Sequence, residues 1–157
     1  MATPADTINQ LKHFFETTYP APESINITTQ FGVFMENASG SLRPFRDISM
    51  NQETTDQITF FKDVLDHAEK RFKSHHEGFK LDLLHIDRED LLASLCDQII
   101  SSIGVAHMLG MNIVDALQEV ADSHDSKLDE DGQPIFSSSS VLMNGQQYFK
   151  PNLSPYI

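Results

Sequence analysis

The stretch DREDLLASLCDQIISSIGVAHMLG, residues 87–110, decides the fold of this chain. Its apolar residues recur at the spacing of an α-helix, and Asp90, Ser94, Asp97 and Ser101, at i, i+4, i+7 and i+11, share one face. Two carboxylates in an otherwise apolar helix are costly to bury unless a cation meets them. The stretch therefore predicts a core helix that carries a metal or a ligand on one face.

Both ends of this helix are marked in the sequence. Asp87 is placed to cap the amino end, with Asp90 at the reciprocal third position. Gly110 supplies a left-handed stop at the carboxyl end. Asn112 then caps a following helix, which has Asp115 in its first turn. Two consecutive helices are predicted here.

Three further helices are predicted upstream from apolar residues at helical spacing. The second of them is expected to end at Gly40 and Pro44, because glycine often closes a helix and proline does not extend one. SHHEGFK, residues 74–80, breaks the pattern after the third, and its adjacent histidines lack the spacing of a zinc site. These helices cover about residues 7–17, 28–41 and 55–74.

The helical pattern is lost from Leu128 onward, where Asp-Gly and Asn-Gly pairs indicate a loop or a short hairpin. No convincing run of alternating polar and apolar residues indicates a strand. The sequence therefore predicts an all-α fold, a four- to five-helix bundle that forms a single domain over residues 1–157. Its helical core covers about residues 7–127, and an irregular C-terminal tail covers 128–157.

Composition restricts the classes of partner. The 157 residues include 23 acidic and 11 basic side chains, a net charge of −12, which disfavours binding to a nucleic acid polymer or an anionic membrane. The amino terminus lacks a signal-peptide pattern, and polar residues interrupt the longest apolar stretch. Cys96 is the only cysteine, and its position predicts a buried packing thiol. We expect a soluble cytoplasmic protein.

Two segments near the carboxyl end carry a family resemblance. They are DLLASLCDQIISSIGVAHMLGMNIVDALQEVADSHDSKLDEDGQPIF, residues 90–136, and VLMNGQQYFKPNL, residues 141–153. They resemble the acid-bearing helix, the SNxSKxxxDGxP ending and the KxxKGxxYxxPxL tail of the all-α nucleotide pyrophosphohydrolases. This family includes MazG, phosphoribosyl-ATP pyrophosphohydrolase and the dimeric dUTPases. INQLKHFFETTYP, residues 8–20, is more weakly similar to the first helix of the family.

The resemblance implies a MazG-like bundle that cleaves a (d)NTP to (d)NMP and pyrophosphate. It also implies Mg²⁺, or Mn²⁺, held by acidic motifs of the form E-x-x-E and E-x-x-D on two helices. Glu36 and Asp97 match these motifs, and Asp90 or Glu89 is a substitute oxygen ligand that assists or orients the water. The residues implied to bind the substrate are Lys127, His124, Tyr148 and Lys150.

The acidic motifs of this chain depart from the family pattern. Ser39 and Ser94 stand where glutamates are expected, Asn37 replaces an adjacent glutamate, and His124 replaces an asparagine. A divalent ion bound by fewer carboxylates loses much of its negative cage. The alternative hypothesis is therefore a nucleotide-binding or nucleotide-sensing protein that keeps the MazG-like fold and is impaired in catalysis.

Several of these residues also have a purely structural interpretation. His124 continues an apolar stripe and is expected to pack in the core, while Tyr148 either stacks on a base or covers the core edge. The long apolar helix has more surface than one small bundle covers, and helices of the family pair across subunits, so we expect a homodimer or a dimer of dimers. Asp97 has an alternative role in an ion pair with one of three arginines, Arg43, Arg46 or Arg71.

Overall fold

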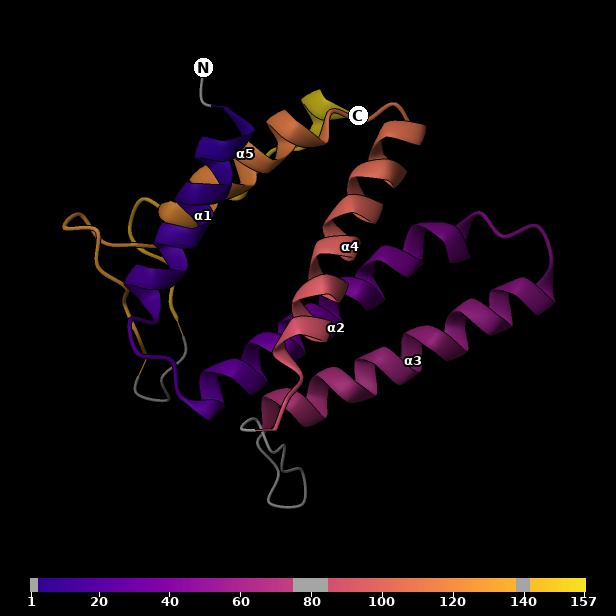
Figure 1. Cartoon of the computed structure of the whole chain (residues 1–157). Helices are drawn as coiled ribbons and strands as arrows, with labels where there is room; N and C mark the ends of the chain where they lie inside the picture. The colour runs from indigo at the N-terminus through magenta and orange to yellow at the C-terminus, as the bar shows by residue number, and fades with distance from the viewer. Residues whose placement is uncertain (1–2, 75–84, 138–141) are drawn as a thin grey trace. The chain divides into compact units, whose positions relative to one another are not determined.

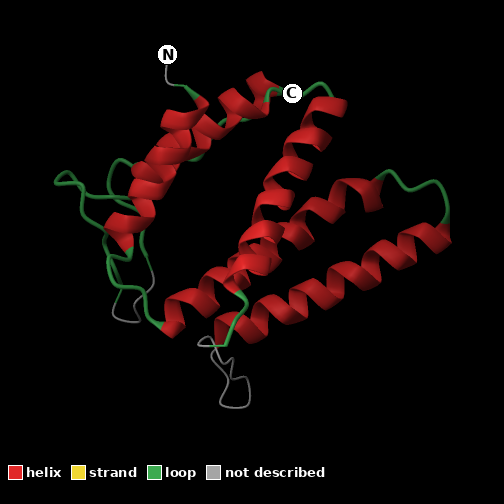
Figure 2. Ribbon diagram, in the orientation of Figure 1, coloured by secondary structure: helices red, strands yellow, loops and turns green. Residues whose placement is uncertain are grey.

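Helices account for the architecture of this chain (Figures 1 and 2). The computed structural model describes residues 3–74, 85–137 and 142–157, and over these ranges it contains five α-helices, one short 3-10 helix and no strand. The predicted all-α class is confirmed. The chain divides into two compact units. Unit 1 is Met1–Pro20 with Asp87–Ile157, and unit 2 is Ala21–Ile86.

In unit 1, α1 (Pro4–Thr18) packs against α5 (Ile113–Asp125). Thr3 begins α1 with a capping box, in which its side chain accepts from the backbone of Asp6 and the Asp6 carboxylate accepts from the backbone of Thr3. Phe14 and Ala121 are buried between the two helices. The Phe14 ring also lies 5.3 Å from the ring of His124, centroid to centroid. His124 is half-buried, and this ring contact is the part of its expected core packing that the structure shows.

The ends of α4 (Arg88–Met108) and α5 follow the sequence signals. The Asp87 side chain accepts from the backbone N–H groups of residues 89 and 90, as an N-cap should. Gly110 has a φ of 75°, the left-handed conformation expected after a helix. Asn112 caps α5, and its backbone N–H donates to Tyr156 of the 3-10 helix η1 (Ser154–Tyr156) at 2.8 Å.

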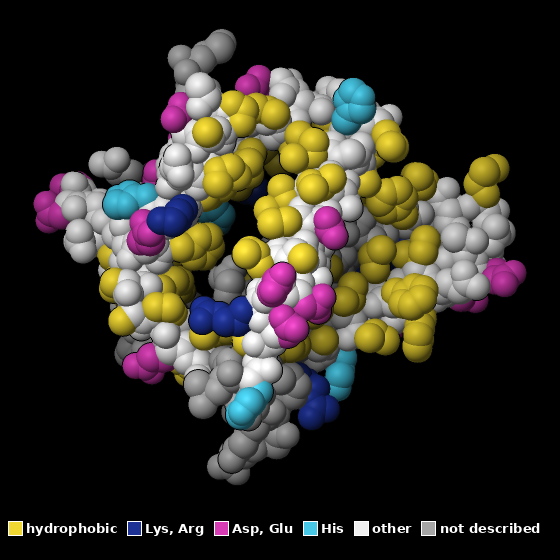
Figure 3. Space-filling view, in the orientation of Figure 1, with side chains coloured by type: hydrophobic (Ala, Val, Ile, Leu, Met, Phe, Trp, Pro, Cys, Tyr) yellow, Lys and Arg dark blue, Asp and Glu magenta, His cyan; other side chains and the backbone are white. Residues whose placement is uncertain are grey.

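The expectation that α4 is a core helix is wrong for the described part of unit 1. Its only buried residue is Ala106, and Cys96 is exposed rather than packed inside. Within unit 1, α5 is the one described helix that α4 packs against, so most of the α4 surface has no neighbour in that unit. Hydrophobic and acidic side chains both lie along α4 in Figure 3.

α4 is also the one helix among the described residues that is long and apolar enough to cross a membrane. Its mean hydropathy is 1.3, which makes it only weakly apolar. Length and composition of one such helix are weak evidence for a membrane span. The chain is therefore consistent with a soluble protein.

Unit 2 is an antiparallel hairpin of α2 (Ser24–Asp47) and α3 (Gln52–Ser74), joined by a short loop (Figure 1). The prediction that α2 ends near Ser41 is wrong, because the helix continues through Pro44 to Asp47. Proline removes one backbone donor, and the long contact with α3 offsets that local loss. The predicted break after α3, with its adjacent histidines, falls on residues 75–84, outside the described residues.

The first part of the C-terminal tail forms the turn that its Asp-Gly pair predicts. The Asp129 carboxylate accepts from the backbone of Gln133 at 2.8 Å, and Gly132 has a φ of 72°. An isolated antiparallel bridge then joins Phe136 to Leu142. The predicted loop or short hairpin is therefore present, without a regular strand on either described side.

Candidate functional site

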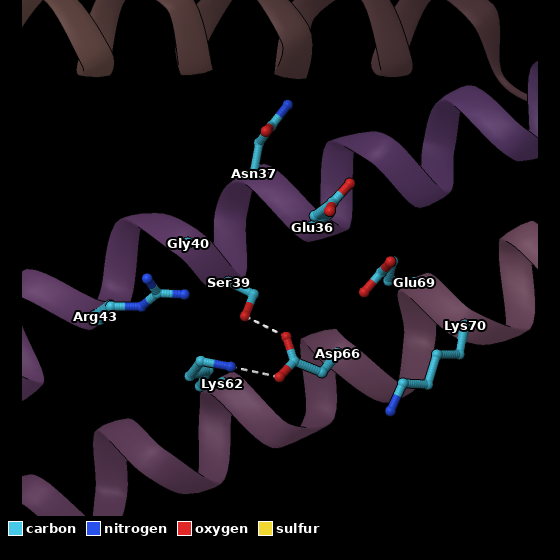
Figure 4. A pocket seen from close by; sticks show the side chains of 9 residues that line it. All are labelled: Glu36, Asn37, Ser39, Gly40, Arg43, Lys62, Asp66, Glu69 and Lys70. Carbon is cyan, nitrogen blue, oxygen red and sulfur yellow. Dashed lines mark hydrogen bonds and ion pairs between the residues drawn. The ribbon is translucent and has the colours of Figure 1, made fainter. Parts of the chain in front are cut away.

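A polar pocket of about 570 Å³ lies on the α2–α3 hairpin (Figure 4). It contains Glu36, one of the predicted metal ligands, together with side chains that the sequence analysis did not select. Three lining residues are acidic and three are basic, so the lining as a whole is close to neutral. The lining residues are Glu36, Asn37, Ser39, Gly40, Arg43, Lys62, Asp66, Glu69 and Lys70.

Ser39 brings a carboxylate from the opposite helix to the centre of this pocket. Ser39 is buried, with 2% of its surface exposed, and its hydroxyl donates to the Asp66 carboxylate of α3. Lys62, one turn before Asp66, donates to the other oxygen of the same carboxylate. The hydrogen bond from Lys62, followed by that from Ser39, lowers the pKa of Asp66. Asp66 is therefore ionised at neutral pH, and each of its two carboxylate oxygens accepts a hydrogen bond.

Lys73 bridges the two remaining carboxylates, one from each helix. Its Nζ donates to Glu36 Oε2 at 2.7 Å and to Glu69 Oε1 at 3.0 Å. Burial acts to lower the pKa of Lys73, but the hydrogen bonds that it donates to Glu36 and Glu69 outweigh burial, and the pKa is raised. Each carboxylate that lines the pocket therefore accepts a hydrogen bond from a lysine ammonium.

The predicted metal ligands do not come together within one unit. Glu36 belongs to unit 2, whereas Glu89, Asp90 and Asp97 lie on α4 in unit 1, where all three are exposed. No group of three or more His, Cys, Asp or Glu side chains that is placed to hold a metal occurs within the described ranges. The Glu36 carboxylate already binds a lysine, so the α2–α3 pocket does not fit a divalent cation. We derive no chemical step through one.

The alternative role of Asp97 also spans the two units. The three arginines considered as its partners all lie on α2 or α3. Arg46 instead pairs with Asp47 beside it at 2.7 Å. Asp97 forms no ion pair with any residue in the described ranges, so neither its structural nor its functional role is tested within unit 1.

The predicted substrate-binding residues, in contrast, all lie in unit 1 and in adjoining segments. Residues 145–152 of the tail run back along the carboxyl half of α5, so that Tyr148 and Lys150 are carried on a segment bonded to the one that bears His124 and Lys127. The bonds are Gly145 N to Lys127 O (2.9 Å), Phe149 N to Ser126 Oγ (3.2 Å), Ser123 Oγ to Phe149 O (2.8 Å) and Asn152 N to Glu119 Oε1 (3.0 Å).

Lys127 is a partly buried cation at the end of α5. Its side chain is half-buried, and burial lowers its pKa. It forms no ion pair with any of the acidic residues in the part of the chain that the structure describes. An ammonium group that is partly desolvated without a counter-ion is costly in free energy. An anionic ligand would remove that cost.

His124 is neutral beside this lysine. Burial, and then the positive charge of Lys127, lower its pKa. Its Nδ1 atom is buried and has no hydrogen-bond partner in the described structure. The aromatic contact with Phe14 holds the ring in place. Lys127 and His124 thus combine a positive charge with an unpaired polar atom at the end of α5.

The sequence analysis missed four lining residues of the α2–α3 pocket, and it also missed Lys73, which contacts two of the lining carboxylates. The four lining residues are Lys62, Asp66, Glu69 and Lys70. Their spacing contains a signal, because Lys62 and Asp66 are four residues apart, as are Glu69 and Lys73, and such pairs share a helix face. These pairs are common on solvent-exposed helices, which is why the pattern alone did not predict a pocket.

Comparisons with known proteins add no relative. No protein-family model, no curated protein and no solved structure matches this chain.

Proposed function

We propose that this protein is a nucleoside triphosphate pyrophosphohydrolase with a MazG-like fold, which cleaves a (d)NTP to (d)NMP and pyrophosphate. The observation that carries the proposal is Lys127, a half-buried ammonium without an acidic partner among the described residues. It lies in the SHDSKLDEDGQP segment, residues 123–134, which belongs to the most specific part of the resemblance, residues 115–134.

A nucleotide phosphate would supply the negative charge that Lys127 lacks among the described residues. Phosphate oxygens accept charge-assisted hydrogen bonds from an ammonium group, and these bonds are stronger than neutral ones. Lys150 and Tyr148 supply a second cation and an aromatic ring on the tail segment that is bonded to the end of α5. We assign the phosphates to Lys127 and Lys150, and the base to Tyr148 and His124.

In the proposed reaction, a water oxygen attacks one phosphorus atom of the α–β linkage. The bond between that phosphorus and the bridging oxygen breaks. The proton of the water passes to a base, and a monophosphate and pyrophosphate leave. Asp97 and Asp90 of α4 would hold the Mg²⁺, or Mn²⁺, that the resemblance implies, whereas Glu36, the third residue it names, is already bound by Lys73. Asp90 or Glu89 would activate the water. Charge neutralisation of the phosphates is the chemistry such an ion supplies.

The test is pyrophosphate release from a panel of ribo- and deoxynucleoside triphosphates with Mg²⁺ or Mn²⁺. We expect turnover by the wild type, a loss of at least about tenfold in kcat/KM for Lys127→Met, and loss of activity for Asp97→Ala. Lys12→Met is the matched control, because Lys12 lies on exposed α1 surface and, among the described residues, pairs only with Glu16. Absence of release from every nucleotide would contradict the proposal.

Nucleotide binding without turnover is a second candidate, and the lysine pairs of the α2–α3 pocket favour it. Asp66 accepts from Lys62, and Glu36 and Glu69 accept from Lys73, so none of the three is left for a metal. Calorimetry separates the two functions. Binding that Lys127→Met weakens, without pyrophosphate release, would support this candidate, and no heat with any nucleotide would contradict both.

We also propose that the protein is a homodimer or a dimer of dimers in which α4 packs against a second copy. The apolar side chains of α4 that remain exposed are Leu92, Ile99, Ile100, Ile103, Val105 and Met108. Burying such side chains contributes roughly 1.5–3 kcal/mol each, which is sufficient to drive association. Light scattering at micromolar concentration should give at least twice the chain mass, and Ile100→Asp should reduce it. A monomeric wild type would refute the idea.

A further inference from the structure

We propose that Lys73 acts as the built-in cation of the α2–α3 pocket, occupying the place between Glu36 and Glu69 where a divalent metal would otherwise bind. Unit 2 then needs no metal for its own carboxylates. The inference concerns these three side chains and does not depend on the proposed hydrolysis.

The geometry is that of a bridging cation. The Nζ atom contacts one carboxylate oxygen from α2 at 2.7 Å and one from α3 at 3.0 Å. It therefore joins acids 33 positions apart in sequence (69 − 36), which is what a shared metal ion does in helical carboxylate sites. Glu69 has 21% of its side chain exposed and Lys73 has 30%, so the Lys73–Glu69 contact is partly shielded from water, whereas Glu36 is 55% exposed.

The backbone of α2 is shaped to admit this lysine. A Cβ atom on Gly32 would lie 2.6 Å from Lys73 Cγ and 3.2 Å from the backbone oxygen of Glu69. Gly32 thus leaves room for the aliphatic stem of Lys73 to cross α2 on its way to Glu36. The lysine is held by packing along its stem as well as by its charge.

Charge balance supports the same conclusion. Lys62 neutralises Asp66, and among the described residues Lys73 is the cation that contacts both of the other carboxylates of the pocket. Removing the ammonium would leave Glu36 and Glu69 facing each other across the hairpin. Two carboxylates in that position repel each other and attract an oxygen-binding divalent cation.

Mn²⁺ titration followed by electron paramagnetic resonance tests the proposal, because bound Mn²⁺ loses the sharp signal of the free ion. Lys73→Met keeps the stem over Gly32 and removes the charge. We expect this variant to bind one Mn²⁺ ion per chain more than the wild type. Lys73→Met combined with Glu36→Gln should lose the additional ion, and Lys73→Arg should not gain it.

Lys12→Met is the matched control, because it removes a lysine that pairs with a single carboxylate, and it should gain no ion. The proposal is overturned if Lys73→Met binds no more Mn²⁺ than the wild type. It is also overturned if the wild type binds an Mn²⁺ ion that Glu36→Gln abolishes, a comparison that remains decisive if Lys73→Met fails to fold. Absence of pyrophosphohydrolase activity changes none of these outcomes, so the two proposals fail separately.

Discussion

Replacing Gly145 with alanine should detach the C-terminal tail from α5. An ideal Cβ atom at this position would lie 2.3 Å from the backbone oxygen of Leu128 and 3.0 Å from that of Lys127. Both neighbours are backbone atoms, which cannot rotate away as a side chain does. The Gly145 N–H also donates to the Lys127 oxygen at 2.9 Å, so any shift that relieves the clash lengthens this bond.

The magnitude follows from two contributions. Overpacking of a closed site costs about 1–3 kcal/mol, and the net loss of one backbone hydrogen bond costs roughly 1 kcal/mol. We therefore expect Gly145→Ala to lower the free energy of unfolding, or that of local tail opening, by about 2–4 kcal/mol. Urea denaturation followed by circular dichroism reports the first, and hydrogen exchange at the amide of Phe149 reports the second.

Gly104→Ala is the control for this experiment. Nothing lies within 4 Å of its ideal Cβ, and the residue is inside α4, so alanine should stabilise the helix by about 0.5–1 kcal/mol. If Gly145→Ala matches the wild type within about 0.5 kcal/mol and Phe149 exchanges at the same rate, the close approach of the tail to α5 is refuted. Weakened nucleotide binding by the same variant would connect tail docking to the proposed site.

Three pH-dependent effects should accompany these changes. The pKa of Asp66 in the folded state is lowered from 3.8, so the ionised carboxylate stabilises the fold above pH 3.8, and this stabilisation is lost as pH falls through the folded pKa. Ser39→Ala should reduce the difference in free energy of unfolding between pH 7 and pH 3, measured by urea titration. Because the folded pKa of His124 is lowered from 6.5, wild-type stability should fall as pH drops below about 6.5, and His124→Phe should flatten that slope. Because the folded pKa of Lys127 is lowered from 10.5, stability should rise as pH approaches 10.5, and Lys127→Met should remove this rise; an unchanged slope in either variant would contradict the burial of that side chain.

Helix ends were predictable because they depend on neighbours in sequence. The caps at Asp87 and Asn112 and the left-handed Gly110 all involve bonds or conformations within a few residues. The end of α2 was not predictable in this way. Pro44 is a local signal to stop, and contacts with α3, which come from a distant segment, override it.

The residues of the candidate site also differ in whether the sequence could predict them. The segment that bears Lys127 was found from its sequence, because its residues stand together in the chain. The bridge from Lys73 to Glu36 was not, because it depends on which face of α2 meets α3. The burial predicted for Cys96 failed for a related reason, since an apolar helix reveals that it needs a partner but not whether the described unit supplies one.

The exposed position of Cys96 has a practical use. It is the only thiol in the chain, so a spin label or fluorophore directed at thiols attaches to α4 at one defined place without any substitution. In an assembly of identical copies, dipolar spectroscopy between such labels would yield the separation of neighbouring α4 helices. Adding one cysteine to the α2–α3 hairpin would extend the measurement to the distance between the two units.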